Sequence, residues 1–193
     1  MSDAAQARLT RQLTFLREID KLKLVERRIS VMGGSRLENS AEHSWHLGVM
    51  VPLLGEYAPE GADPERAMRM LLIHDVVEVD AGDTFCFDAE ANRDKAERET
   101  EAARRLFGLL PADQGAELRA LWDEFEAGET PTARFANALD RFQGLLMNHA
   151  NGGGTWIEHG ITRERILARM DPIREGAPAL WPHVLAVVEE VVG

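Results

Sequence analysis

Apolar residues recur every three to four positions over most of this chain, the spacing of helices that bury one face. The alternation with period two that marks a half-buried strand is nearly absent. The pattern therefore predicts an all-α protein, a bundle of about seven helices. We expect the main helices over residues 5–28, 39–57, 64–79, 89–109, 113–127 and 130–151, followed by shorter segments interrupted by Pro172, Pro178 and Pro182.

Several helix boundaries carry local signals. Asn39 and Glu42 have the spacing of a capping box, which predicts the start of the second helix. Gly33 and Gly34 break the chain before it, and Pro131 suits the first position of a later helix. With 193 residues and no internal repeat, residues 1–193 are expected to form a single domain.

Charge and cysteine content narrow the possible functions. Acidic residues number 33 and basic residues 22, a formal net charge of −11, which argues against binding polymeric nucleic acid through many Lys and Arg contacts. A single phosphate remains a possible ligand. The lone Cys86 excludes an intrachain disulfide and a Cys-rich zinc site. The polar N-terminus and the lack of a long apolar run predict a cytoplasmic protein with no membrane partner.

Three of the expected helices place a possible metal ligand on their apolar face. These residues are His43, His74 and Asp140, and Asp75 directly follows His74. Adjacent helical side chains point about 100° apart, so His74 and Asp75 can share an ion only at the edge of their helix. A buried ionised Asp is costly, and metal coordination between facing helices is one way to compensate it. From the residues alone, a metal site and hydrogen-bonded core residues both remain open.

Two further acids follow this pair. Glu78 lies one helical turn after His74, and Asp83 lies in the predicted loop 81–88. A carboxylate beside a metal site can orient an attacking water or accept its proton. The alternative for Glu78 is a solvent-facing position at a helix end.

The order of these residues resembles a known family. His43, then His74-Asp75, then Asp140 follows the pattern that names the HD-domain superfamily. The segments 38–46, 73–78, 81–84 and 138–141 are similar to those of its 5′-deoxynucleotidase branch. The likeness covers residues 13–161, so residues 162–193 are expected to be helices that pack on this HD-domain core.

The resemblance implies a fold, a reaction and a set of site residues. It implies a helical protein, usually a homodimer, that hydrolyses the 5′-phosphate of (deoxy)nucleoside monophosphates with one divalent ion, which could be manganese, cobalt, iron, zinc or magnesium. It also implies a role for each matched residue: His43, His74, Asp75 and Asp140 as metal ligands, Glu78 as the acid acting on water, Asp83 as an acid near the leaving oxygen, and Arg27 as the phosphate-binding residue.

One position departs from this pattern. Arg28 stands where characterised bacterial members of the branch have a Trp that helps to discriminate deoxyribose from ribose. We expect Arg28 on the substrate side, which leaves the sugar preference open; the alternative is a side chain directed outward. Two other interpretations of the whole protein also stay open. A non-catalytic metal- and nucleotide-binding sensor would keep the site without turnover, although the presence of Glu78 and Asp83 favours an enzyme, and a purely structural protein would hold no metal.

Overall fold

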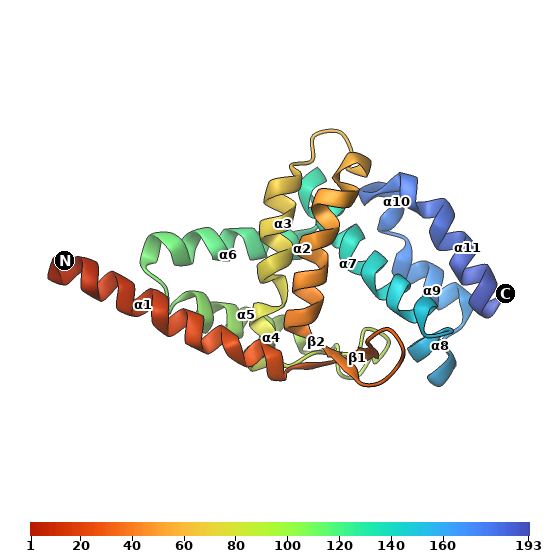
Figure 1. Cartoon of the computed structure of the whole chain (residues 1–193), viewed down its shortest axis with the longest axis horizontal. Coiled ribbons are helices and arrows are strands. Elements are labelled where there is room, and N and C mark those ends of the chain that lie inside the picture. The colour runs from red at the N-terminus through yellow and green to blue at the C-terminus, as the bar shows by residue number, and fades with distance from the viewer.

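Helix α7 (Pro131–Ala150) runs through the middle of the molecule and connects its two halves (Figure 1). The computed structural model describes residues 1–193, and the two termini lie at opposite ends of an elongated molecule (Figure 1). The all-α prediction is confirmed. The helices are α1 (Asp3–Ile19), α2 (Ser40–Leu54), α3 (Pro64–Ile73), α4 (Glu78–Ala81), α5 (Lys95–Phe107), α6 (Ala112–Ala127), α7, α8 (Gly154–Glu158), α9 (Arg163–Met170), α10 (Ile173–Gly176) and α11 (Trp181–Val192), with the 3-10 turns η1 (Asp20–Leu24), η2 (Gly55–Tyr57), η3 (His74–Val77) and η4 (Pro178–Leu180).

The predicted start of α2 is confirmed in detail. The backbone N–H of Glu42 donates to Asn39 Oδ1 at 3.0 Å, and the backbone N–H of Asn39 donates to Glu42 Oε2 at 3.2 Å. This reciprocal pair satisfies two backbone donors at the helix end. It also fixes where α2 begins, and therefore the direction in which His43, one residue further on, points.

The prediction of one helix over residues 5–28 is wrong beyond Leu24. The chain leaves η1 and forms the strand β1 (Glu26–Ser30), which pairs antiparallel with β2 (Leu37–Asn39). Gly33 and Gly34 have positive φ, which lets the chain turn back. The residues of β1 are good helix formers, so local propensity hides a strand that only the pairing with β2 stabilises. The hairpin carries Arg27 and Arg28 to the centre of the molecule.

The predicted helix over residues 64–79 is also not continuous. Helix α3 ends at Ile73, the chain tightens into η3, and α4 follows as a separate turn. A 3-10 turn has three residues per turn, so His74 and Asp75 diverge more than in an α-helix. At the end of α4, Gly82 has φ of 72° and turns the chain away, which directs Asp83 into the following loop.

The later helices agree with the periodicity more closely. α6 and α7 match the expected ranges, whereas α5 begins at Lys95 and not near residue 89. The expected C-terminal segments are α8 to α11. Helix α10 packs so tightly on α7 that a Cβ added to Gly176 would lie 2.1 Å from the carbonyl oxygen of Arg134.

Two clusters of buried apolar side chains form the core. The larger one joins α2, α3 and α7 to α9, α10 and α11, and the smaller one joins α1 and α5 to η3. Val76 and Val77 of η3 belong to the smaller cluster and are almost fully buried. Packing from both sides therefore holds η3, and with it His74 and Asp75, in a rigid position.

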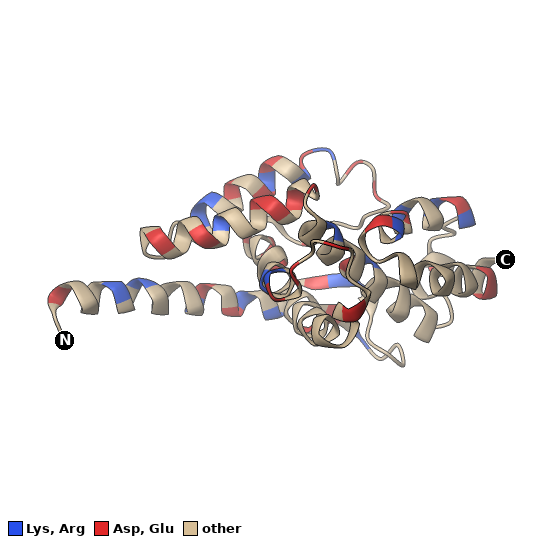
Figure 2. Ribbon diagram, turned by 90° about the horizontal axis from the view of Figure 1, so that it is seen from above, with Lys and Arg blue, Asp and Glu red and all other residues tan.

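The charged residues lie mainly on the outer helices, where Lys and Arg are interspersed with Asp and Glu (Figure 2). No helix of the structure is both long enough and apolar enough to cross a membrane.

Candidate functional site

His43, His74 and Asp75 meet in the buried centre of the molecule. One ligand atom from each of these three lies within 4.8 Å of the others, and all three residues are buried. The imidazole rings of His43 and His74 have centroids 5.4 Å apart. Residues from α2 and η3 that are 31 positions apart in the chain are thus brought into reach of one ion.

The imidazole of His74 is oriented toward this cluster. Its Nδ1 lies 2.8 Å from the carbonyl oxygen of Leu71, which can only accept, so Nδ1 carries the proton and donates. Its Nε2 is buried and has no hydrogen-bond partner, although Asp75 Oδ1 lies 3.0 Å away. Burial lowers the pKa of His74, but the carboxylates of Asp75 and Asp140 outweigh it and raise the pKa to about 9. A buried nitrogen that lacks a partner beside two carboxylates fits a metal ligand.

Asp140 lies beside His43 in the structure. Its Oδ1 is 3.0 Å from His43 Nε2, and the same nitrogen is 3.9 Å from Asp75 Oδ2. Burial together with the nearby Arg27 lowers the pKa of His43, so its neutral ring donates to Asp140. Asp140 therefore completes a set of two imidazoles and two carboxylates. This mixed set of nitrogen and oxygen donors suits a divalent transition metal or magnesium better than calcium.

Glu38 also lies in the site, although the sequence predicted no role for it. Its side chain is 3% exposed, its Oε1 accepts from Gln143 Nε2 at 2.8 Å, and its Oε2 lies 3.8 Å from His43 Nδ1 and 3.5 Å from Arg27 Nε. Burial raises the pKa of Glu38 to about 6. Its place in a hairpin strand could not be read from the pattern, because only the pairing of β2 with β1 turns Glu38 inward.

Arg27 lies between Glu38 and the metal cluster. Its Nη1 donates to Asp75 Oδ2 at 2.9 Å, and its Nη2 makes no hydrogen bond within the chain. Burial lowers the pKa of the guanidinium, but four surrounding carboxylates raise it above its ordinary value. Arg27 is therefore a permanent positive charge, fixed on one side and free to donate on the other.

Glu78 is buried and does not face solvent. Its Oε2 accepts a 2.6 Å hydrogen bond from the hydroxyl of Ser40, the first residue of α2. Burial, followed by the charge of Asp75, raises the pKa of Glu78 to about 9. An acid held in this way beside the cluster can exchange a proton near neutral pH, and a bound cation would bring its pKa down.

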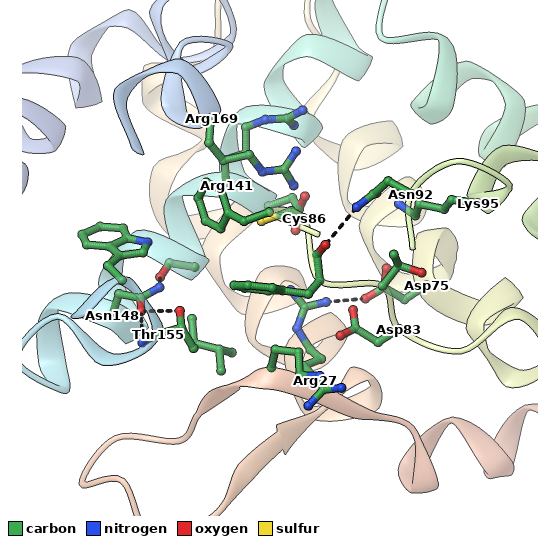
Figure 3. Close-up of a pocket in the computed structure, with 18 of the residues that line it drawn as sticks. Arg27, Asp75, Asp83, Cys86, Asn92, Lys95, Arg141, Asn148, Thr155 and Arg169 are labelled. Atoms are coloured by element: carbon green, nitrogen blue, oxygen red, sulfur yellow. Dashed lines mark hydrogen bonds and ion pairs between the residues drawn. The ribbon is translucent and has the colours of Figure 1, made fainter. Parts of the chain in front are cut away.

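A cavity of about 210 Å³ opens above the cluster. Asp75, Glu78 and Asp140 line it together with Arg27, Arg28 and Asp83, and Figure 3 shows Arg27, Asp75 and Asp83 close to one another. This volume lies below the range of about 300–1,000 Å³ typical of pockets for drug-sized ligands, which favours a small substrate.

The two remaining predicted residues lie at the wall of this cavity. Burial raises the pKa of Asp83, so a proton is held more firmly on this acid than on an exposed Asp. Arg28 is exposed at the rim, so it lines the cavity without being enclosed by it.

Further polar residues also line the cavity. They are Asn92, Lys95, Arg141, Asn148, Thr155 and Arg169 (Figure 3). Arg141 directly follows Asp140 of the motif, whereas no spacing rule links the other five to the His-Asp pattern, because they converge only when α5, α7, α8 and α9 pack together.

Comparison with known proteins gives matches over most of the chain. The model of the HD domain family matches residues 19–181. A crystal structure of a predicted metal-dependent phosphohydrolase from Magnetospirillum magnetotacticum superposes with a TM-score of 0.93, is 51% identical, and covers 99% of this chain and 96% of that one.

Two relatives are named for the same enzymatic activity. The 5′-deoxynucleotidase HDDC2 of Homo sapiens is 32% identical over 135 residues, and the match covers 69% of this chain but only 65% of the human protein. A 5′-deoxynucleotidase of Erwinia tasmaniensis is 26% identical over 166 residues, covering 80% of this chain and 83% of that protein.

Proposed function

This chain belongs to the HD domain family, and from that premise we propose that it is a metal-dependent phosphohydrolase that removes the 5′-phosphate from deoxynucleoside and nucleoside monophosphates. The observation that carries the proposal is the convergence of His43, His74 and Asp75 within 4.8 Å, next to a small cavity that Asp75 lines. The names of the relatives from Homo sapiens and Magnetospirillum magnetotacticum support the same reaction.

One divalent ion is proposed as the cofactor, held by His43, His74, Asp75 and Asp140. When bound, such an ion acts as a Lewis acid that polarises a phosphoryl group and acidifies water. The chain offers both an imidazole nitrogen of His74 that has no hydrogen-bond partner and carboxylates that burial alone would not keep ionised.

Arg27 is proposed to hold the phosphate. Asp75 accepts from its Nη1 and Glu38 lies near its Nε, so the guanidinium is pre-oriented while Nη2 stays free to donate. A guanidinium offers donors in a fork that matches phosphate oxygens, and a fixed donor loses little conformational entropy on binding.

Glu78 and Asp83 are proposed to move the two protons of the reaction. As the oxygen of water bonds to phosphorus, Glu78 accepts the water proton, and as the bond to the 5′-oxygen breaks, Asp83 gives its proton to that oxygen. The products are then inorganic phosphate and a nucleoside. Burial raises the pKa of Asp83, and this direction suits the donor role because it favours the protonated form.

We also propose that the protein is a homodimer that binds through an exposed apolar face. Trp45, Val49 and Leu53 follow one another at intervals of four along α2 and are 67%, 41% and 67% exposed. Leu72 of α3, 46% exposed, extends this face beside Gly48. A patch of four large apolar residues on one side of two helices is typical of an association surface, and a second copy of the chain offers the same face in return.

A direct assay tests the proposed activity. The protein, loaded in turn with manganese, cobalt, zinc or magnesium, is incubated with deoxynucleoside and nucleoside 5′-monophosphates, and released phosphate is measured. We expect release that stops after chelation and returns with metal. Tight nucleotide binding without phosphate release from any substrate would contradict the enzyme and favour the sensor interpretation.

A further inference from the structure

The basic residues that line the cavity differ in whether they have acidic partners. Arg27 pairs with Asp75 at 2.9 Å, and Lys95 pairs with Glu99 at 3.4 Å. Arg141 and Arg169 also line the cavity, yet neither forms a salt bridge with any carboxylate of the chain. These two charges therefore have no ion-pair partner within the protein.

Arg141 is held in place on one side only. Its Nη1 donates to the carbonyl oxygen and to Oδ1 of Asn137, at 3.2 and 2.9 Å. Its Nε is buried and has no hydrogen-bond partner. Buried donors are nearly always paired, so an unpaired one on a fixed arginine that lines a cavity points to a missing acceptor.

Arg169 approaches Arg141 from another element. It lies in the last turn of α9, a position where the helix dipole favours a cation. That preference explains why α9 has an arginine here, but not why the side chain lines the cavity. The guanidinium makes no hydrogen bond with the chain. Figure 3 shows the two guanidinium groups next to each other, with Cys86 between them and Arg27.

The proximity of these two cations is unfavourable unless an anion joins them. The guanidinium of Arg141 is partly buried, and Arg169 is the cation that lies nearest to it. Arg27, by contrast, is surrounded by carboxylates. Two like charges in a partly buried site are destabilised both by desolvation and by their mutual repulsion. An oxyanion between them offsets both costs.

We propose that Arg141 and Arg169 form a second anion subsite, which binds a second phosphate on the substrate, distant from the phosphate that is hydrolysed. The proposal rests on the proposed function and names its substrate class: a nucleotide that carries a further phosphate besides the 5′-phosphate. A phosphate fits better than a carboxylate, because its three terminal oxygens and higher negative charge let it accept from two guanidinium groups that approach from different sides.

The position of Arg141 limits how far apart the two phosphates lie. Arg141 directly follows Asp140, a proposed metal ligand, and consecutive Cα atoms are about 3.8 Å apart. The length of one extended arginine side chain therefore sets the separation between the two phosphates. A single sugar ring can span this length. A 3′,5′-bisphosphate carries both phosphates on one sugar, and it is therefore the substrate chosen for the test.

The test compares 2′-deoxyadenosine 5′-monophosphate with 2′-deoxyadenosine 3′,5′-bisphosphate on the metal-loaded full-length protein. Charge-assisted hydrogen bonds contribute enough that we expect a kcat/KM for the bisphosphate about tenfold or more above that for the monophosphate. In Arg169→Met and Arg141→Met this ratio should fall toward one. The control Arg163→Met removes an exposed arginine of the same helix α9 and should keep the ratio.

Binding to the Glu78→Gln variant, measured by calorimetry, provides a readout independent of turnover. The Kd of the bisphosphate should be about tenfold below that of the monophosphate, and adding Arg169→Met should abolish the difference. Equal Kd values for the two compounds would overturn the subsite. So would an Arg169→Met variant that instead changes preference among the four bases, because the arginines would then recognise the base. If neither compound is hydrolysed by the wild-type protein, the proposed function fails, and the Kd values still decide the subsite.

Discussion

The hydroxyl of Ser40 donates a 2.6 Å hydrogen bond to the carboxylate of Glu78, across 38 residues of sequence and between two different helices. Ser40 is the first residue of α2, and its position follows from the capping box formed by the residue before it. The first residue of one helix thus orients the first residue of another, the acid that we propose as the proton acceptor. This contact also stabilises the charged form of Glu78 and opposes the effect of its burial.

Replacing Glu78 should abolish most activity while preserving the metal site. A general acid or base contributes about 10²–10⁴-fold, so Glu78→Gln should lower kcat by that factor with unchanged metal content. Glu97→Gln, an exposed acid on α5, is the matched control and should retain full activity. The measurements are steady-state kinetics and elemental analysis. Wild-type turnover by Glu78→Gln would exclude the proposed role.

Replacing Ser40 should shift the pH dependence of kcat/KM. Removing its hydroxyl withdraws a donor from the carboxylate of Glu78 and therefore raises the pKa of that acid. If the ionised Glu78 accepts the proton, the acidic limb of kcat/KM in Ser40→Ala should move upward by about one pH unit, the equivalent of one charge-assisted hydrogen bond. A lower rate without a shift of the acidic limb would show that Ser40 only supports the structure.

Metal affinity should rise with pH through the neutral range. The carboxylates around His74 raise its pKa to about 9, so the metal-free site holds a proton there that a metal ligand must release. Below this pKa, the apparent affinity should increase about tenfold per pH unit for each proton released. Calorimetry of manganese binding between pH 6 and 8, in buffers of different ionisation enthalpy, measures both quantities. Affinity that is independent of pH, with no proton released, would contradict His74 as a ligand.

Arg28 should weaken the discrimination between sugars. A flexible polar side chain at the cavity rim makes a poorer wall against the 2′-hydroxyl than a flat ring, because a loose pocket accommodates one hydroxyl at little cost. We expect the ratio of kcat/KM for dAMP over AMP to stay below about a hundredfold, or about 2.7 kcal/mol, and to increase in Arg28→Trp. A larger ratio in the wild type would show that another residue forms this wall.

A charge placed in the apolar face of α2 should separate the proposed homodimer. Trp45 is a large, 67% exposed residue of this face, so Trp45→Glu would bury an unpaired carboxylate at the interface. Size-exclusion chromatography with light scattering should show a dimer for the wild type and a monomer for the variant. Ile157→Glu changes a similarly exposed apolar residue on α8 and should leave the dimer intact. A monomeric wild type would refute the dimer itself.

The sequence by itself determined the helical class, the capping box of α2, the limits of α6 and α7, and the His-Asp pattern that identifies the family. These features depend on interactions between residues close in the chain or on a motif whose order is visible in one dimension. The prediction was wrong where short-range and long-range preferences disagree. Residues 26–30 are good helix formers but pair as a strand, and the helix that carries His74 tightens into a 3-10 turn.

Only the tertiary structure decided which residues surround the pattern. Gln143 on Glu38, Ser40 on Glu78, and Arg141 beside Arg169 bring together segments far apart in the sequence. No periodicity encodes such contacts, because they form only when the helices pack against one another. That packing decides which buried polar atoms find a hydrogen-bond partner and which do not. The identity of the proposed metal ligands was therefore visible in the chain, whereas the second anion subsite could be inferred only from the folded molecule.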